Sequence, residues 1–199
     1  MNQVVFLPGA GGRRQFWAPV AERLCLTDEP LLLGWPGFGD TPPDPRVRSL
    51  TDLVDYVLDR IEAPADLVAQ SMGGGVALLL VLRRPTAVRR LVLCGTSGGI
   101  DMRRFEADDW RSGHALPEEA PRWFVDDCTD LTDRLPQVTT QTLLLWGEAD
   151  SVSPPAVGRC LAGVLPCAQL VTIAAAGHML AEERPQEVAA QIQAFLEGP

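Results

Sequence analysis

The stretch Ala69-Gln70-Ser71-Met72-Gly73-Gly74 places a lone serine between an apolar run at 65–68 and a segment of small and aliphatic residues at 73–82. The first run predicts a strand and the second a helix that begins with glycines. A strand, a sharp turn with serine at its apex and a helix form a nucleophile elbow, which lifts the serine hydroxyl clear of the sheet. Glycines fit there because a side chain would clash where the elbow packs against its neighbours. The stretch therefore predicts Ser71 as a nucleophile.

Around this stretch, short apolar runs alternate with helix-period segments, which predicts an α/β fold with a mostly parallel sheet covered by helices. The expected strands, about six, lie at 4–7, 31–33, 66–69, 90–94, 142–146 and 169–173. The expected helices lie at 15–24, 49–62, 72–84, 155–164 and 185–196. Ser49, followed three residues later by Asp52, is a plausible cap for the second helix. A chain of 199 residues suits a single domain, 1–199.

The segment at about 97–139 breaks this alternation. It is polar and helix-like, with helices expected at 101–111 and 117–127, and it follows the end of a strand. Ligands of open α/β sheets bind beyond the carboxyl ends of the strands, so we interpret the segment as a small lid over a site. Its aromatic residues, and a tryptophan in an earlier loop, are candidates for an apolar substrate pocket, although core packing explains some of them equally well: Trp35, Trp110, Trp123 and Phe124.

Composition excludes several classes of protein. The formal net charge is −9 and all 17 basic residues are arginine, so nucleic acid is an unfavourable partner. The five scattered cysteines lack the spacing of a zinc site or a disulfide framework. No metal or organic cofactor is implied by the sequence. The N-terminus does not resemble a signal peptide, and no apolar run reaches the ~20 residues of a membrane span. We expect a cytoplasmic protein; its oligomeric state is not predicted.

A serine nucleophile needs a histidine base, and the histidine needs a carboxylate that orients it. Of the two histidines, His178 follows the last expected strand, whereas His114 lies in the polar segment, so His178 is the preferred base. The strand at 142–146 is followed by a loop that contains Asp150, the preferred acid, and Glu148, the alternative. The chain order of serine, aspartate and histidine is that of one hydrolase fold rather than of the serine proteases.

The same chemistry needs N–H donors for an oxyanion, and a glycine-rich turn beside the elbow can supply them. Residues 7–12, Leu-Pro-Gly-Ala-Gly-Gly, follow the first expected strand. We therefore predict the backbone N–H groups of Ala10 and Met72 as the oxyanion hole. A phosphate-binding loop is disfavoured because the turn lacks the Gly-Lys-Ser/Thr ending and the Gly-x-Gly-x-x-Gly spacing.

Five motifs in order resemble those of the α/β-hydrolase fold: Leu-Pro-Gly-Ala-Gly-Gly, Gly-Trp-Pro-Gly-Phe-Gly-Asp-Thr, Ala-Gln-Ser-Met-Gly-Gly, Trp-Gly-Glu-Ala-Asp and Gly-His-Met-Leu-Ala-Glu-Glu-Arg-Pro. The resemblance covers essentially the whole chain. It implies a lid inserted after the strand at 90–94, and it places Ser71, Asp150 and His178 on the triad positions of the family.

The sequence departs from the family pattern at several positions. Ala69 stands where the elbow usually has glycine, and Gly34 where the family often has an acidic residue. Pro8 replaces a histidine before the oxyanion turn, which can alter how that turn is braced. The family's first two strands have no counterpart, so we expect a minimal version of the fold.

The resemblance implies an enzyme that cleaves a small-molecule carboxylic ester or thioester, although the triad alone does not separate this activity from others. A serine nucleophile argues against the dehalogenases and epoxide hydrolases of the fold, which use aspartate. Carbon–carbon bond hydrolases and the lyase of the menaquinone pathway keep the same three residues. A receptor-like protein that binds a small molecule and turns it over slowly is a further alternative; an inert scaffold is disfavoured.

Arginines near the expected site raise the question of an anionic substrate. They are Arg13, Arg14, Arg103, Arg104, Arg111 and Arg122. Guanidinium groups could bind a carboxylate or a carrier-protein phosphate. Alternatively, the lid arginines are solvated and pair with the acidic residues around them, as exposed charges mostly do.

Overall fold

The structure, a computed structural model, describes residues 3–110, 121, 123, 125, 127 and 129–198. These residues form one parallel sheet in the order β2-β1-β3-β4-β5-β6. Its strands are β1 (Val4–Leu7), β2 (Leu31–Leu32), β3 (Ala65–Gln70), β4 (Val88–Cys94), β5 (Gln141–Gly147) and β6 (Ala168–Ile173). The expected six-stranded parallel sheet is confirmed, with ends shifted by one or two residues.

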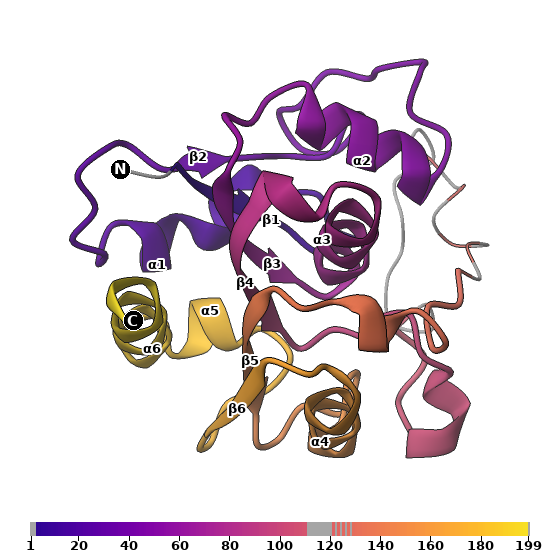
Figure 1. Ribbon diagram of the computed structural model, residues 1–199, viewed down its shortest axis with the longest axis vertical. Helices are drawn as coiled ribbons and strands as arrows, with labels where there is room; N and C mark the ends of the chain where they lie inside the picture. The colour runs from indigo at the N-terminus through magenta and orange to yellow at the C-terminus, as the bar shows by residue number, and fades with distance from the viewer. Residues whose placement is uncertain are drawn as a thin grey trace.

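Helices cover both faces of the sheet (Figure 1). One face carries α2 (Leu50–Leu58), α3 (Met72–Arg83) and α4 (Pro155–Val164); the other carries α1 (Ala18–Ala21), α5 (Leu180–Glu183) and α6 (Pro185–Glu197). Successive strand residues supply opposite cores: Leu67 packs toward α2 and α3, and Val68 toward α1 and α6. Because helices cover both faces of the sheet, the inner strand β1 is fully buried and reads as a continuous apolar run.

Two predicted helices are shorter than expected. The helix expected at 15–24 is instead a 3₁₀ turn, η1 (Arg14–Trp17), followed by the single turn α1. The helix expected at 49–62 ends at Leu58, since the N–H of Arg60 bonds to the Val57 carbonyl and Pro64 disfavours helix just before it. Its predicted start is confirmed, because the Ser49 hydroxyl accepts the N–H of Asp52 at 3.1 Å.

The segment after β4 contains less helix than expected. The predicted helix at 101–111 is wrong over its described residues, where the 3₁₀ turn η3 (Met102–Phe105) is followed by non-helical residues at 106–109. Glu106 then adopts φ 52°, a left-handed conformation that ends the turn. Most of the helix expected at 117–127 lies outside the described residues. Two further 3₁₀ elements in the described part of the chain are η2 (Pro85–Ala87) and η5 (Leu135–Gln137).

The parallel order brings the loops after β1, β3, β4, β5 and β6 to one edge of the sheet. Each of the residues proposed from sequence as catalytic or as an oxyanion donor lies in or next to one of these loops. Within the described ranges, no helix is long and apolar enough to cross a membrane.

Candidate active site

Ser71 occupies the sharp turn between β3 and α3. Its backbone has φ 52° and ψ −118°, a conformation that non-glycine residues rarely adopt and that costs about 1–3 kcal/mol. The N–H of Ser71 donates to the Cys94 carbonyl at 3.0 Å, which ties the turn to the neighbouring strand. Strain of this kind persists only where the surroundings fix it, as at a nucleophile elbow.

Two glycines at the start of α3 allow the elbow to pack closely. A Cβ on Gly73 would lie 2.5 Å from the Pro8 carbonyl oxygen, and one on Gly74 would lie 2.5 Å from Thr96 Oγ1. Both distances are shorter than real Cβ contacts, so a side chain at either position would clash, as the sequence predicted. Ala69 replaces the usual glycine inside β3, where it is fully buried.

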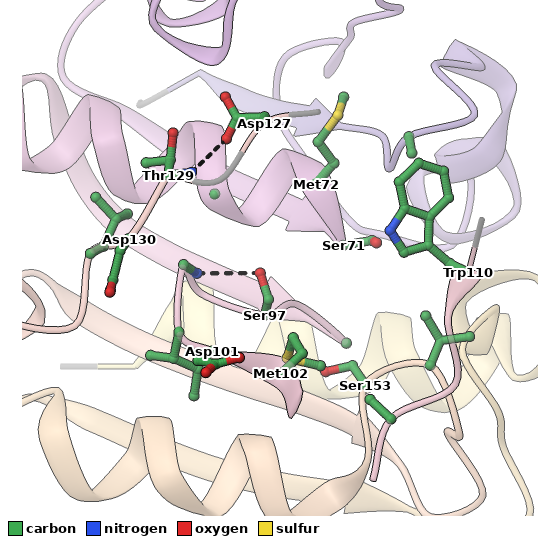
Figure 2. A pocket seen from close by; sticks show the side chains of 18 of the residues that line it. Ser71, Met72, Ser97, Asp101, Met102, Trp110, Asp127, Thr129, Asp130 and Ser153 are labelled. Atoms are coloured by element: carbon green, nitrogen blue, oxygen red, sulfur yellow. Dashed lines mark hydrogen bonds between the residues drawn. The ribbon is translucent and has the colours of Figure 1, made fainter. Parts of the chain in front are cut away.

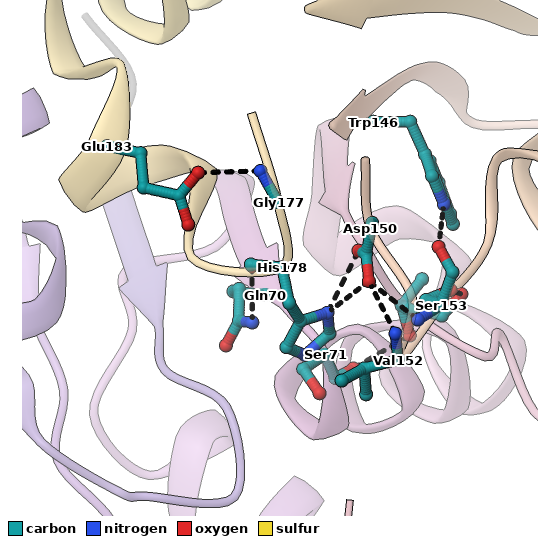
Figure 3. Close-up of polar contacts among 10 residues, drawn as sticks. Gln70, Ser71, Trp146, Asp150, Val152, Ser153, Gly177, His178 and Glu183 are labelled. Atoms are coloured by element: carbon teal, nitrogen blue, oxygen red, sulfur yellow. Dashed lines mark hydrogen bonds and ion pairs between the residues drawn. The ribbon is translucent and has the colours of Figure 1, made fainter. Parts of the chain in front are cut away.

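His178 and Asp150 are hydrogen bonded in the way that a general base requires. His178 Nδ1 lies 2.9 Å from Asp150 Oδ2 and 3.1 Å from Asp150 Oδ1 (Figure 3). Asp150 is 2% exposed, and its Oδ1 also accepts the N–H groups of Val152 at 3.0 Å and Ser153 at 2.7 Å. A buried carboxylate is tolerated because these donors replace water. It can therefore orient the imidazole and stabilise its protonated form.

The loop that carries His178 is held from two sides. Glu183 Oε2 accepts the N–H of Gly177 at 2.6 Å, and Gln70 Nε2 donates to the His178 carbonyl at 3.4 Å. Ala175 turns this loop with φ 51°. The sequence analysis did not identify Gln70 or Glu183 as supports, although Gln70 directly precedes the serine and Glu183 lies within the motif that follows the histidine.

A cavity of about 750 Å³ connects the predicted site residues. Ser71, His178, Ala10 and Met72 all line it, and Figure 3 shows Ser71 beside the His178 ring. Met72 is the first residue of α3, so its N–H has no acceptor within the helix. The structure thus brings the predicted nucleophile, the predicted base and both predicted oxyanion donors to one cavity, with Asp150 hydrogen bonded to the predicted base.

The four aromatic residues predicted to bind substrate lie in different environments. Trp110 lines the cavity near Ser71 (Figure 2). Trp35 does not line it; its indole is fully buried and donates to the carbonyls of Gly9 at 2.9 Å and Pro8 at 3.1 Å. Trp35 therefore supports the oxyanion turn, which corrects the expectation that it contacts substrate. Trp123 packs against the core, and Phe124 lies outside the described residues.

Acidic side chains and one arginine surround the outer part of the cavity. They are Asp101, Asp108, Asp109, Asp127, Asp130 and Arg103. Arg103 donates to Asp101 through Nε at 2.9 Å and Nη2 at 2.8 Å, and these hydrogen bonds lower the pKa of the Asp101 carboxyl. Arg13 likewise pairs with Glu182 and Arg14 with Asp40.

The remaining candidates lie on the surface or outside the described residues. Glu148, the alternative acid, is exposed, and His114, Arg111 and Arg122 fall outside the described part of the chain. Among the described residues, no three His, Cys, Asp or Glu side chains are grouped so that they could hold a metal ion.

The sequence and the fold of this chain are similar to those of known hydrolases. The sequence profile of the family described as "Alpha/beta hydrolase family" matches residues 4–191. A pimeloyl-[acyl-carrier protein] methyl ester esterase of Neisseria meningitidis is 25% identical over 244 aligned positions, which cover 100% of this chain and 94% of that protein. A 2-hydroxymuconate semialdehyde hydrolase of a Pseudomonas strain is 28% identical over 213 positions, 84% of this chain and 75% of that protein. A solved hydrolase of Pseudomonas aeruginosa superposes with a TM-score of 0.80 at 22% identity, over 99% and 90% of the two chains.

Proposed function

Because the chain belongs to the alpha/beta hydrolase family, we propose that it hydrolyses a carboxylic ester or thioester through an acyl-enzyme on Ser71. The family assigned from the sequence motifs is confirmed, and with it an enzyme of the hydrolase type. The observation that carries the proposal is the hydrogen-bonded pair of Asp150 and His178, with Ser71 at a strained elbow in the same cavity.

In this mechanism Ser71 Oγ attacks the acyl carbon while His178 Nε2 takes its proton, and Asp150 stabilises the imidazolium. The N–H groups of Ala10 and Met72 hold the oxyanion of the tetrahedral intermediate. The imidazolium then gives its proton to the leaving alcohol or thiol. In the second half, His178 removes a proton from water, which attacks the acyl-enzyme. The imidazolium then returns that proton to Ser71 Oγ as the C–O bond to the serine breaks and the acid is released.

The experiment is hydrolysis of p-nitrophenyl esters of increasing chain length, with fluorophosphonate labelling in parallel. We expect the wild type to turn over and to be labelled, and Ser71→Ala to lose both. Ser97→Ala removes another serine that lines the cavity and should keep the label. An unlabelled wild type without esterase activity would contradict the proposal, as would a Ser71→Ala variant that retains both.

Carbon–carbon bond hydrolysis is the second candidate, because the 2-hydroxymuconate semialdehyde hydrolase is among the relatives. The same three residues can serve that reaction, so mutation of the triad does not separate the two. Turnover of a conjugated dienone acid, followed as loss of its visible absorbance, would favour the second candidate if it exceeded turnover of every ester in the series.

A further inference from the structure

The two proposed oxyanion donors belong to two peptide groups. The N–H of Ala10 shares a plane with the Gly9 carbonyl, and the N–H of Met72 with the Ser71 carbonyl. In a planar trans peptide the N–H and the C=O point in opposite directions. A group that holds the carbonyl therefore also fixes the direction of the N–H.

The Gly9 carbonyl is held by two donors. The Trp35 indole N–H donates to it at 2.9 Å, and the N–H of Gly12, three residues along, donates at 3.0 Å. Trp35 is 0% exposed, so water does not compete for its N–H. In the turn that contains Gly9, Pro8 stands where the family has a histidine. The hydrogen bonds from Trp35 hold this turn in place.

The Ser71 carbonyl is held in the same manner. The Thr96 hydroxyl donates to it at 2.7 Å, and the N–H of Gly74, again three residues along, donates at 2.9 Å. Thr96 is also 0% exposed. It reaches the carbonyl because Gly74 has no Cβ, which would otherwise lie 2.5 Å from Thr96 Oγ1. Each donor peptide thus has one backbone anchor and one buried side-chain anchor on its carbonyl.

The geometry points to Trp35 and Thr96 as paired positioning residues that aim the Ala10 and Met72 N–H groups at the oxyanion. This inference rests on the proposed acyl-transfer function. Neither residue is among the described side chains that line the cavity, so both act through the peptides they hold. Their loss should weaken binding of the tetrahedral state and leave binding of the substrate almost unchanged.

The chain offers a matched control for each residue. Trp17 is also fully buried, and its indole donates to the Leu7 carbonyl at 2.9 Å, but the next residue, Pro8, has no N–H to aim. Thr142 is 1% exposed and donates to the Thr140 carbonyl at 2.8 Å, at the opposite end of the sheet. Trp17→Phe and Thr142→Val therefore remove the same kind of hydrogen bond without disturbing an oxyanion donor.

The test compares Trp35→Phe and Thr96→Val with these two controls. Loss of an oxyanion donor lowers kcat by about 10²–10³-fold, so a donor that is present but no longer aimed should cost about tenfold, with KM within about twofold. A trifluoromethyl ketone is the second probe. Ser71 Oγ adds to its carbonyl carbon, the proton passes to His178, and the carbonyl oxygen becomes an oxyanion. The corresponding alcohol binds without this step.

We expect both variants to lose about tenfold in affinity for the ketone and to bind the alcohol as the wild type does. Thr96→Ser, which keeps the hydroxyl, should restore both kcat and ketone affinity. Should Thr96→Val fail to fold, Trp35→Phe tests the same inference independently.

If wild type and variants are equally active and bind the ketone equally, the inference is overturned while the proposed function stands. Equal losses in Trp17→Phe and Thr142→Val would also overturn it, because the effect would then be one of general stability. A wild type that neither hydrolyses esters nor is labelled by fluorophosphonate would overturn the proposed function itself.

Discussion

The proposed catalytic loops, which carry Ser71, Asp150 and His178, and the inserted segment at 97–139 are held in different ways. In the catalytic loops, hydrogen bonds join residues distant in sequence: Ser153 donates to the Thr96 carbonyl across 57 positions, and Gln70 to the His178 carbonyl across 108. In the described part of the inserted segment, side-chain hydrogen bonds such as that of Asp127 to the N–H of Thr129 are local. The bonds that reach further are from the backbone: the N–H of Asp108 donates to the Ser151 carbonyl and that of Leu131 to the Gly99 carbonyl, both at 2.8 Å. The proposed catalytic loops are thus tied to distant elements by side chains, whereas the described inserted segment is tied to them by its backbone.

The largest effect should follow from breaking the buried pair in the catalytic loops. Asp150→Asn keeps the shape of the side chain but favours the wrong tautomer of His178, and we expect kcat to fall about 10⁴-fold with little change in KM. Steady-state ester hydrolysis measures it. Glu148→Gln is the control: Glu148 is exposed and lies two positions before Asp150, so this variant should keep nearly full activity. The assignment of the acid would be wrong if the two variants exchanged these results.

A second prediction tests how tightly the elbow is packed. Gly74→Ala places a Cβ 2.5 Å from Thr96 Oγ1 and 2.7 Å from its Cβ, and overpacking of this kind costs about 1–3 kcal/mol. Gly75→Ala meets nothing within 4 Å and should stabilise α3 by about 0.5–1 kcal/mol. The midpoint of urea unfolding should therefore fall in Gly74→Ala and rise in Gly75→Ala. A shift of the same sign in both would show that the elbow tolerates the extra methyl group.

The same difference between the regions explains what sequence alone could predict. The strands were predictable from local signals, such as the apolar runs of β1 and β3. The meeting of Ser71, Asp150 and His178 at one edge of the sheet was predictable from a glycine-flanked serine and from polar residues that follow strands. The roles of Thr96 and Trp35 were not, because each depends on a carbonyl far along the chain, and hydrophobic periodicity says nothing about where a buried N–H or O–H finds its acceptor. In the inserted segment, helix-like composition was overridden by Glu106 in a left-handed conformation.

In the inserted segment, we expect a substitution to change the preference among ester substrates rather than the chemical step. Trp110 lines the cavity near Ser71, so Trp110→Ala removes apolar surface from the region where an acyl chain would lie (Figure 2). We expect kcat/KM for a long-chain ester to fall about tenfold relative to that for the acetate, which serves as the internal control. An equal loss for both esters would instead place Trp110 in support of the catalytic loops.

The smallest effect should come from Arg103, the described arginine that lines the cavity. Its side chain is 90% exposed and already donates twice to Asp101, and these hydrogen bonds lower the pKa of the Asp101 carboxyl. Exposed pairs of this kind contribute little because water and salt screen them. We therefore expect Arg103→Gln to change the ratio of kcat/KM for a p-nitrophenyl monoester of glutarate to that for the neutral butyrate less than about twofold. Because Arg103 lies among five aspartates of the cavity wall, a tenfold fall in that ratio would require a substrate carboxylate to compete successfully with Asp101 for the guanidinium. That result would assign anion recognition to the inserted segment.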